Sequence, residues 1–462
     1  MNPTQSTYAK KEPIKIKVDL NIRNPLSKSG VWVRSENFYG EGDGGEAVLI
    51  IGFDTEFKPP EEVLTREDIK EGRGNYRVLS YQLHCKIIDP SLSESPEWGT
   101  ISYPEPGQRL EFGDLLSAAL QEAVLTKPDV KIPRKIYLVG HFTRADLPAI
   151  ADFKQLTPFL TAARNTFITG IPLAVELMLG NQSVGLKMHL RDTMLLTPAA
   201  SKSLQALGQL VEVPKVKLDD DPVREQFYKA NMDALLAEKP DLFDHYAMTD
   251  AVICVRYIEL LLDQCEEILG RRHVPPTLTS IGVDLLIREW EGRVGDWRAL
   301  LGMEQVTEKV FDKRTNRPFR KRTIVPFKQV DYHLALANEA YHGGRNEQFW
   351  FGPAFEDNWT DYDLSGAYPT AMALIRTPDW RRIYVTDDVT KFTERTLGVA
   401  DVDFEFPETV RFPTMPVRTE NGLIFPRRGT TACGAPEIAL ALRLGASIKI
   451  NHGVIVPDVA LR

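Results

Sequence analysis

The sequence has few cysteines, no long apolar runs and no excess of positive charge over its 462 residues. Its four cysteines (Cys85, Cys254, Cys265 and Cys433) form no CxxC pair and have no histidine at metal-ligand spacing, so they predict reduced, packed side chains. The longest apolar run, residues 47–53, has seven residues and is too short to cross a membrane. The first 30 residues carry no apolar segment typical of a signal peptide. These absences favour a cytoplasmic protein with no membrane partner.

The net charge of −8 does not by itself indicate a protein that binds nucleic acid. Residues 309–328 are a local exception, because they hold eight Lys or Arg against the single acid Asp312. This stretch is either a phosphate-binding element or a solvated basic loop or hairpin.

Periodicity and turn residues predict several domains, as the length requires. Residues 1–45 are polar and glycine-rich, and we expect them to be poorly ordered. From there to residue 272 strands and helices alternate, which predicts an α/β domain with a mixed sheet flanked by helices. The expected strands begin at residue 47, where one carries Asp54 and Glu56, and cover residues 76–88, 135–140 and 191–196. The expected helices are 112–125, 204–210 with Ser203 as cap, and 241–270 with Gly270 as stop. Residues 273–354 predict a helical connector that contains the basic stretch, and residues 355–462 a second region rich in strands.

Acidic residues recur at positions that would bring them together. Asp54 and Glu56 lie two apart at the end of an apolar strand and so share one face of it. Tyr246 and Asp250 lie one turn apart on a helix, and Asp146 follows the buried strand 135–140. Two carboxylates 4 Å apart repel by about 4 kcal/mol at an effective dielectric of about 20. A pocket with four of them needs cations, and two Mg²⁺ or Mn²⁺ ions are the usual answer.

Taken singly, each of these features has an ordinary structural explanation: an acidic edge strand, a helix cap or a solvated helix face. Their order and spacing together resemble the three motifs of the DEDD 3′–5′ exonucleases, in the subtype with tyrosine in the third motif. The resemblance implies a ribonuclease H-like fold in which Asp54, Glu56 and Asp250 hold two divalent ions. It also implies that Asp146 positions the second ion and that Tyr246 orients the attacking water.

The sequence departs from that family around the second motif. Family-B proofreading domains usually have Asn four residues before the motif's Asp and an aromatic residue one before it. Here Phe142 and Ala145 occupy these positions. We expect Phe142 to stack on a base of the DNA instead.

A second group of motif residues follows about 110 residues after Asp250. Asp363 is followed at +5 and +6 by Tyr368 and Pro369, which resembles motif A of family-B DNA polymerases. In that family the acid, at a strand end, binds the catalytic metal, and the tyrosine closes the nucleotide's sugar pocket. The run Tyr341-His-Gly343-Gly344-Arg345 resembles the Tyr-x-Gly-Gly loop that contacts DNA between the exonuclease and polymerase domains.

The resemblance, over roughly residues 47–462, is to the N-terminal part of a family-B DNA polymerase of the protein-primed, organellar, viral or mobile-element type. It implies a proofreading exonuclease followed by an incomplete α+β polymerase palm at residues 355–462. The lysine-bearing fingers motif and the second palm acid are missing from the 462 residues, so we expect no polymerisation by them alone. The implied partners are DNA with a single-stranded 3′ end or a primer–template. The resemblance also implies two further partners: a deoxynucleotide, and a second chain that completes the palm. The alternatives are a stand-alone 3′–5′ exonuclease and a non-catalytic DNA-binding replication protein.

Overall fold

The computed structural model describes residues 16–19, 33–40, 46–58, 76–179, 181–198, 202–312, 317–353, 356 and 358–459. The chain forms two compact units, Met1–Arg288 and Glu289–Arg462, and the division falls inside one helix, α10 (Leu278–Val294). Most of residues 1–45, expected to be poorly ordered, lie outside the described residues. Of those described, Val33 and Phe38 are buried in the core of the first unit.

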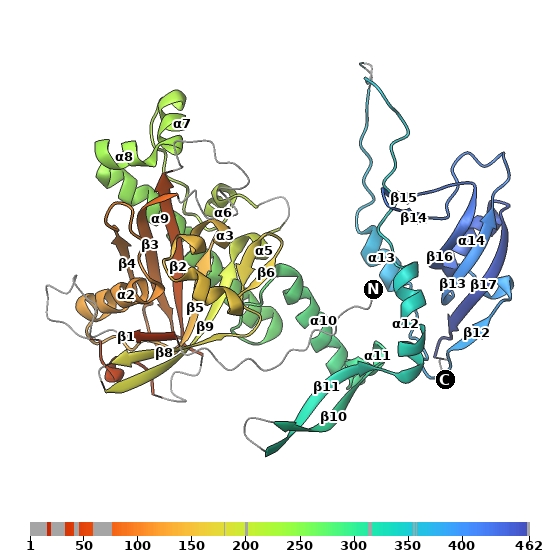
Figure 1. Ribbon diagram of the computed structural model, residues 1–462, viewed down its shortest axis with the longest axis horizontal. Helices are drawn as coiled ribbons and strands as arrows, with labels where there is room; N and C mark the ends of the chain where they lie inside the picture. Colours follow the sequence, from red (N-terminus) through yellow and green to blue (C-terminus); the bar gives the residue numbers. More distant parts are fainter. Residues whose placement is uncertain are drawn as a thin grey trace. The chain divides into compact units, whose positions relative to one another are not determined.

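The first unit is built on a mixed sheet of seven strands (Figure 1). Its strands in spatial order are β1 (Ile16–Asp19), β8 (Leu173–Leu179), β9 (Gln182–Asp192), β5 (Lys135–Gly140), β2 (Val48–Lys58), β3 (Arg77–Ile88) and β4 (Glu97–Ser102). The pairs β1/β8, β9/β5 and β5/β2 are parallel and the others antiparallel. The predicted α/β class with a mixed sheet and flanking helices is therefore confirmed.

Side chains of β2 alternate between two cores, one on each face of the sheet. Leu49, Ile51 and Phe53 belong to the core beneath α2 (Phe112–Thr126). Val48 and Ile50 belong to the core beneath α9 (Pro240–Leu269). Because the side chains alternate, the acids that follow at even positions point to the α9 side.

Shorter elements complete this unit. They are η1 (Ser35–Asn37), α3 (Thr143–Asp146), η2 (Leu147–Ala149), α4 (Phe153–Leu156), η3 (Thr157–Phe159), β6 (Thr161–Ala163), β7 (Thr166–Ile168), α5 (Thr193–Leu196), α6 (Leu204–Leu210), α7 (Pro222–Ala230) and α8 (Met232–Glu238). Ser203 caps α6 and Gly270 ends α9 with a left-handed φ of 66°, both as predicted. The strand predicted at 191–196 is wrong beyond Asp192. There the Asp192 side chain accepts a hydrogen bond from the Met194 N–H and begins the short helix α5.

The segment after α9 is tied to the rear of the sheet by buried polar groups. Lys135 Nζ donates to the Arg272 carbonyl over 2.9 Å, and Arg191 Nε donates to the Val274 carbonyl over 2.9 Å. The Val274 N–H donates to the Tyr137 hydroxyl over 3.2 Å. The Arg191 side chain is only 1% exposed, so its guanidinium depends on these carbonyl partners for stabilisation.

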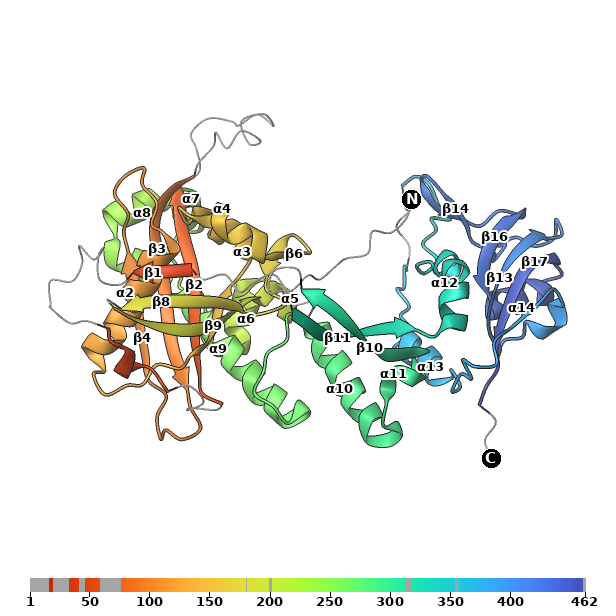
Figure 2. The same ribbon diagram turned by 60° about the horizontal axis from the view of Figure 1, so that its bottom comes forward.

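The second unit combines two hairpins, helices and a four-stranded antiparallel sheet (Figure 2). The sheet has the order β12 (Tyr384–Thr386), β17 (Ser447–Val456), β13 (Leu397–Glu405) and β16 (Arg428–Gly434). The hairpins are β10 (Met303–Asp312) with β11 (Arg317–Pro326), and β14 (Val417–Thr419) with β15 (Gly422–Ile424). The helices are α11 (Trp297–Leu300), α12 (Lys328–Ala340), α13 (Ala367–Ala373), η5 (Val389–Lys391) and α14 (Ala435–Arg443). None of the described helices is both long enough and apolar enough to cross a membrane.

Candidate active site

Asp54 and Glu56 continue the face of β2 that packs against α9. At Gly52, the preceding residue on that face, an added Cβ would lie 2.2 Å from the Ala251 carbonyl oxygen. The helix backbone therefore rests directly on the strand one step before Asp54. This close approach brings Asp250, the neighbour of Ala251, to the level of the two strand acids.

Asp146 arrives from the turn that follows β5. Phe142 adopts a left-handed φ of 66° there, unusual for a residue with a side chain. Asp192, at the end of the adjacent parallel strand, holds this turn by accepting the Phe142 N–H over 3.2 Å and the Thr143 N–H over 2.6 Å. The Asp146 Oδ1 atom accepts a hydrogen bond from the Thr55 hydroxyl over 2.8 Å. Asp146 is thereby fixed against β2.

Helix α9 supplies the remaining predicted groups, and a lysine accompanies them. Tyr246 and Asp250 lie one turn apart on the helix face toward β2. Lys215 Nζ lies 2.8 Å from Asp250 Oδ2 and 5.2 Å from the centre of the Tyr246 ring. The Lys215 ammonium group therefore places a positive charge beside the carboxylate of Asp250.

Burial and mutual repulsion govern the ionisation of the cluster. Burial, then Asp146, Asp250 and Glu56, raise the pKa of Asp54, and the nearby Lys215 opposes the rise. Burial and Asp250 raise the pKa of Glu56 to about 8. Burial also raises the pKa of Asp146 to about 7 against the Thr55 hydrogen bond, and raises the pKa of Asp250 against Lys215. Burial, the largest single influence, tends to lower the pKa of Lys215, but Asp250, Tyr246 and Asp54 together raise it.

The residues fit a divalent cation chemically. The donors are carboxylates, which hard cations prefer, and Asp250 Oδ1 is buried with no hydrogen-bond partner among the described residues. Across the described ranges, however, no three His, Cys, Asp or Glu side chains form a ready coordination shell. The carboxylates are close enough to shift one another's pKa. Joint coordination of an ion would require the side chains to move and Lys215 to release Asp250.

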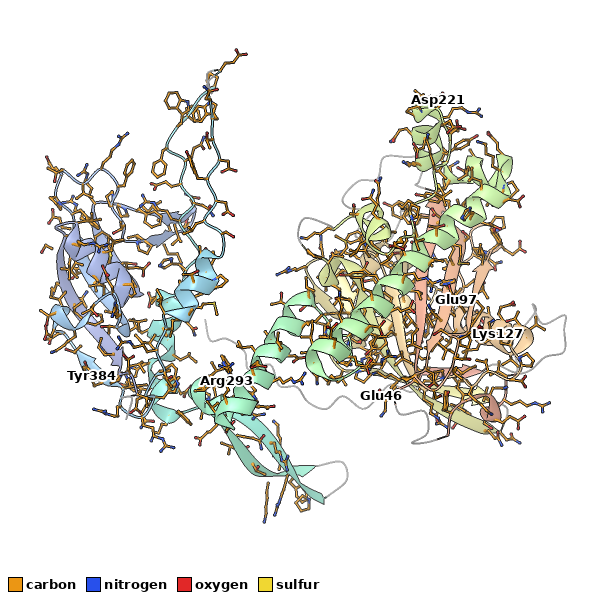
Figure 3. All side chains as sticks on the ribbon, turned by 180° about the vertical axis from the view of Figure 1, so that it is seen from behind. Glu46, Glu97, Lys127, Asp221, Arg293 and Tyr384 are labelled. Atoms are coloured by element: carbon orange, nitrogen blue, oxygen red, sulfur yellow. The ribbon has the colours of Figure 1, made fainter. Side chains whose placement is uncertain are left out.

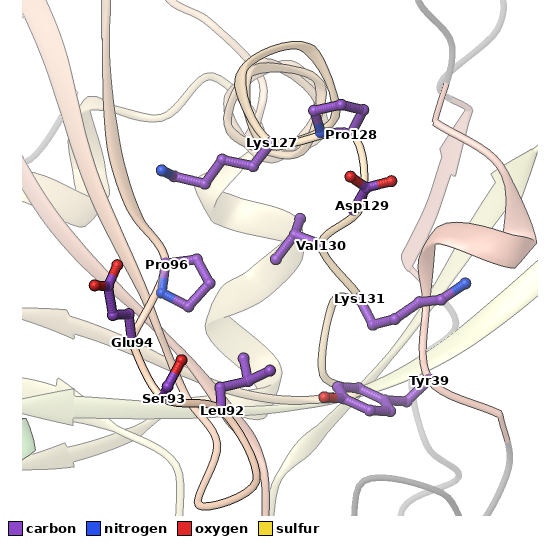
Figure 4. A pocket seen from close by; sticks show the side chains of 10 residues that line it. All are labelled: Tyr39, Leu92, Ser93, Glu94, Pro96, Lys127, Pro128, Asp129, Val130 and Lys131. Atoms are coloured by element: carbon purple, nitrogen blue, oxygen red, sulfur yellow. The ribbon is translucent and has the colours of Figure 1, made fainter.

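Two hollows of the first unit lie near opposite ends of β2. One, of about 170 Å³, is lined by the residues next to Glu56 and Asp146, namely Phe57 and Ala145, and by Tyr76, Arg109 and Pro148 among others. The other, of about 420 Å³, lies at the opposite end of β2, between the β3–β4 turn and the segment after α2 (Figure 4). None of the four acids lines either hollow.

The predicted residues of the second unit do not form a comparable cluster. The strand expected to carry Asp363 is absent: residues 358–364 form no helix or strand, and Asp363 is exposed. This segment pairs with no strand among the described residues 289–459, so its backbone forms no β-sheet hydrogen bonds. The hydroxyl of Tyr368 nevertheless lies close to Gly344, where an added Cβ would be 2.9 Å from it. The structure thus joins the Tyr-x-Gly-Gly loop, with Tyr341 and Gly343, to the motif that begins at Asp363.

Two site residues escaped the sequence reasoning. No role was predicted for Lys215, although a lysine after proline between two acidic motifs could have suggested a counter-charge. The turn-holding role of Asp192 depends on the parallel pairing of β5 with β9, which no local pattern reveals.

No protein-family model matches the chain, and no solved structure matches it. Among curated proteins, the chain is similar to the primer-independent DNA polymerase PolB of Escherichia coli, with 30% identity over 89% of this chain and 48% of the relative. The chain thus spans about half the length of this relative.

Proposed function

We propose that the chain is the N-terminal part of a family-B DNA polymerase and that its first unit is a metal-dependent 3′–5′ exonuclease of ribonuclease H-like fold. The observation that carries the proposal is the convergence of Asp54, Glu56, Asp146 and Asp250 around one lysine. Four acids at such close quarters destabilise a fold unless cations join them. The similarity to a DNA polymerase makes DNA the natural substrate.

In this proposal Asp54, Glu56 and Asp250 hold two Mg²⁺ or Mn²⁺ ions, and Asp146 positions the second. Divalent ions supply Lewis-acid stabilisation of the phosphate and lower the pKa of bound water. Burial raises the pKa of Tyr246 to about 12, so its hydroxyl stays protonated and can orient the attacking water by a hydrogen bond. Lys215 keeps Asp250 ionised until the cation arrives. Phe142, which is 36% exposed on the turn before Asp146, is available for stacking on the terminal base.

The test is hydrolysis of single-stranded DNA by the 462-residue chain with Mg²⁺ or Mn²⁺. We expect release of nucleoside monophosphates from the 3′ end. Asp54→Ala should lower the rate more than about 100-fold, since even the partners that orient metal ligands contribute about 10- to 100-fold. Release from the 5′ end only, or unchanged hydrolysis by Asp54→Ala/Asp250→Ala, would overturn the assignment.

For the second unit we propose the first part of a polymerase palm, with Asp363 as a metal-binding acid and Tyr368 beside the nucleotide's sugar. Polymerisation would then require a deoxynucleotide, a primer–template and the second palm acid from elsewhere. One observation favours the alternative of a stand-alone exonuclease whose second unit is a DNA platform: Asp363 is exposed on an irregular segment. The proposed place of action is a cytoplasmic nucleoid or replication site, or its equivalent in an organelle or a virus-infected host.

A further inference from the structure

Aromatic and arginine side chains alternate along one part of the second unit. They come from the long extension between α12 and α13 and from the loops on either side of the β14–β15 hairpin (Figure 1). The Arg345 guanidinium lies 4.3 Å from the centre of the Phe425 ring and 5.8 Å from that of Phe349. Phe349 meets Phe412 edge-on, with ring centres 5.0 Å apart, and Arg411 lies 5.0 Å from the Phe412 ring. We call these five residues the aromatic–arginine ladder.

Arg345 organises the ladder from within and is not free for an outside partner. Its Nη1 donates to the Pro413 carbonyl over 2.9 Å, and its Nε donates to Glu347 over 2.7 Å. These bonds join the extension to the loop that carries Phe412. The prediction that Arg345 itself contacts phosphate is therefore less favoured than a role in holding the rings in place.

The outer members of the ladder face solvent. Phe349 is 66% exposed and Phe412 is 46% exposed, and Phe351 nearby is 98% exposed. Aromatic side chains so exposed are usually part of a binding surface. Arg411 forms no ion pair within the described part of the chain, so its charge is available.

The charges around the rings favour an anionic partner. Residues 406–428 contain four arginines, at 411, 418, 427 and 428, and two acids, Glu408 and Glu420. On the extension, Glu347, the acid nearest Phe349 in sequence, is neutralised by Arg345, and the acids Glu356, Asp361 and Asp363 lie farther along. Exposed rings bind the faces of bases, and arginines between them bind phosphates, which is how proteins hold single strands without reading sequence.

We propose that the aromatic–arginine ladder binds single-stranded DNA, with bases stacked on Phe349 and Phe412 and a phosphate at Arg411. The choice of DNA over other anionic polymers rests on the proposed function. A duplex hides the faces of its bases, so the ladder should prefer single strands.

The test measures the affinity of the full chain for a labelled single-stranded oligothymidine, without divalent ions so that no hydrolysis occurs. Phe349→Leu/Phe412→Leu keeps apolar bulk but removes the ring faces, and should weaken binding at least about tenfold, since each stacked ring accounts for roughly 5- to 150-fold. Arg411→Gln should reduce the slope of log affinity against log salt by about 0.7. Tyr384→Ala is the matched control, because Tyr384 is 42% exposed but lies on β12, at the opposite edge of the sheet from β16 (Figure 3).

A second readout locates the bound strand directly. Photo-crosslinking with an oligonucleotide that carries 5-iodouracil should modify residues 349–351 or 412, whatever the stability of the variants. Crosslinks confined to the first unit, or equal affinity of the leucine variant and the wild type, would overturn the proposal, as would equal affinity for duplex. A hydrolysis assay with a dinucleotide separates the two hypotheses, because a dinucleotide is too short to span the ladder and tests the nuclease site alone. If the wild type does not hydrolyse the dinucleotide, the exonuclease proposal is refuted. The affinity of the ladder for the oligonucleotide is then judged independently.

Discussion

Lys215 Nζ lies 2.8 Å from Asp250 Oδ2 and also acts electrostatically on Asp54 and Glu56. This ion pair gives the metal-free protein a cation of its own where a nuclease would place a divalent ion. It also makes the state of Asp250 depend on a residue from a different part of the chain. Because Lys215 opposes the rise in the pKa of Asp250, its removal should be visible in the pH dependence of the site.

Lys215→Met should lower hydrolysis by roughly 10- to 100-fold, as expected for a partner that orients a metal ligand. The acid limb of the rate–pH profile should move to higher pH, because Asp250 without the lysine holds its proton more tightly. Lys215→Arg, which keeps the charge, should retain the limb near its original position. If the rate fell equally at every pH and the acid limb stayed at the same pH, the lysine would act only in packing.

Tyr246→Phe removes a single hydroxyl on the face of α9 that carries Asp250. Turnover should fall, by roughly 100-fold, because a group that positions water contributes on that order. Metal affinity, measured by titration calorimetry with Mn²⁺, should stay the same, since no carboxylate changes. A parallel loss of metal affinity would instead assign the hydroxyl a structural role.

The stability of the metal-free protein should fall as pH rises. Glu56 and Asp146 have pKa values of about 8 and about 7, whereas carboxyl groups in unfolded chains titrate near about 4. Between these limits the folded protein holds protons that the unfolded chain has released, so the free energy of unfolding decreases with pH. Urea unfolding with a chelator should show the decrease up to about pH 8, levelling off above it.

Glu56→Gln is the control for this pH dependence, because the amide does not titrate. Its stability should change less with pH than that of the wild type over the same range. Added Mg²⁺ should stabilise the wild type more at high pH, where it competes with fewer protons. If the wild type instead gained stability relative to Glu56→Gln as pH rises, the raised pKa values would be wrong.

Gly52→Ala tests the contact between β2 and α9. The new methyl would meet the Ala251 carbonyl at 2.2 Å, so helix and strand must separate, at a cost of about 3 kcal/mol. Gly185→Ala, in β9, meets nothing within 4 Å and should change the free energy of unfolding by less than about 1 kcal/mol. Equal stability of the two variants would show that the packing is looser than described.

Sequence patterns identified most of the first unit because its signals are local. An apolar run marked β2, strand-forming residues marked β3, and the α9 boundaries followed from a long helical pattern that ends at Gly270. The acids could be grouped because their spacing within each element sets the face on which they lie. The short helix α5 was mistaken for strand, since a capping aspartate and the end of a strand look alike in sequence.

Long-range relationships were beyond reach of the sequence. The ion pair of Lys215 with Asp250, the grip of Asp192 on the Phe142 turn and the ladder around Arg345 all join segments distant along the chain. In the second unit the motif around Asp363 predicted a strand that the described residues do not form. A strand needs a neighbour, and no local pattern can supply one.

The buried bonds that tie residues 272–274 to Lys135, Tyr137 and Arg191 also define a mechanical load path. A pull transmitted along the chain from α10 would reach β5 and β9 through these bonds, and it would reach α9 through the bond from Arg288 Nη1 to the Ile268 carbonyl. Both strands run toward the acid cluster: β5 leads into the Asp146 turn, and β9 ends at Asp192, which holds that turn. Tension on the downstream chain would therefore be transmitted to Asp146 through the strands and to Asp250 through the helix.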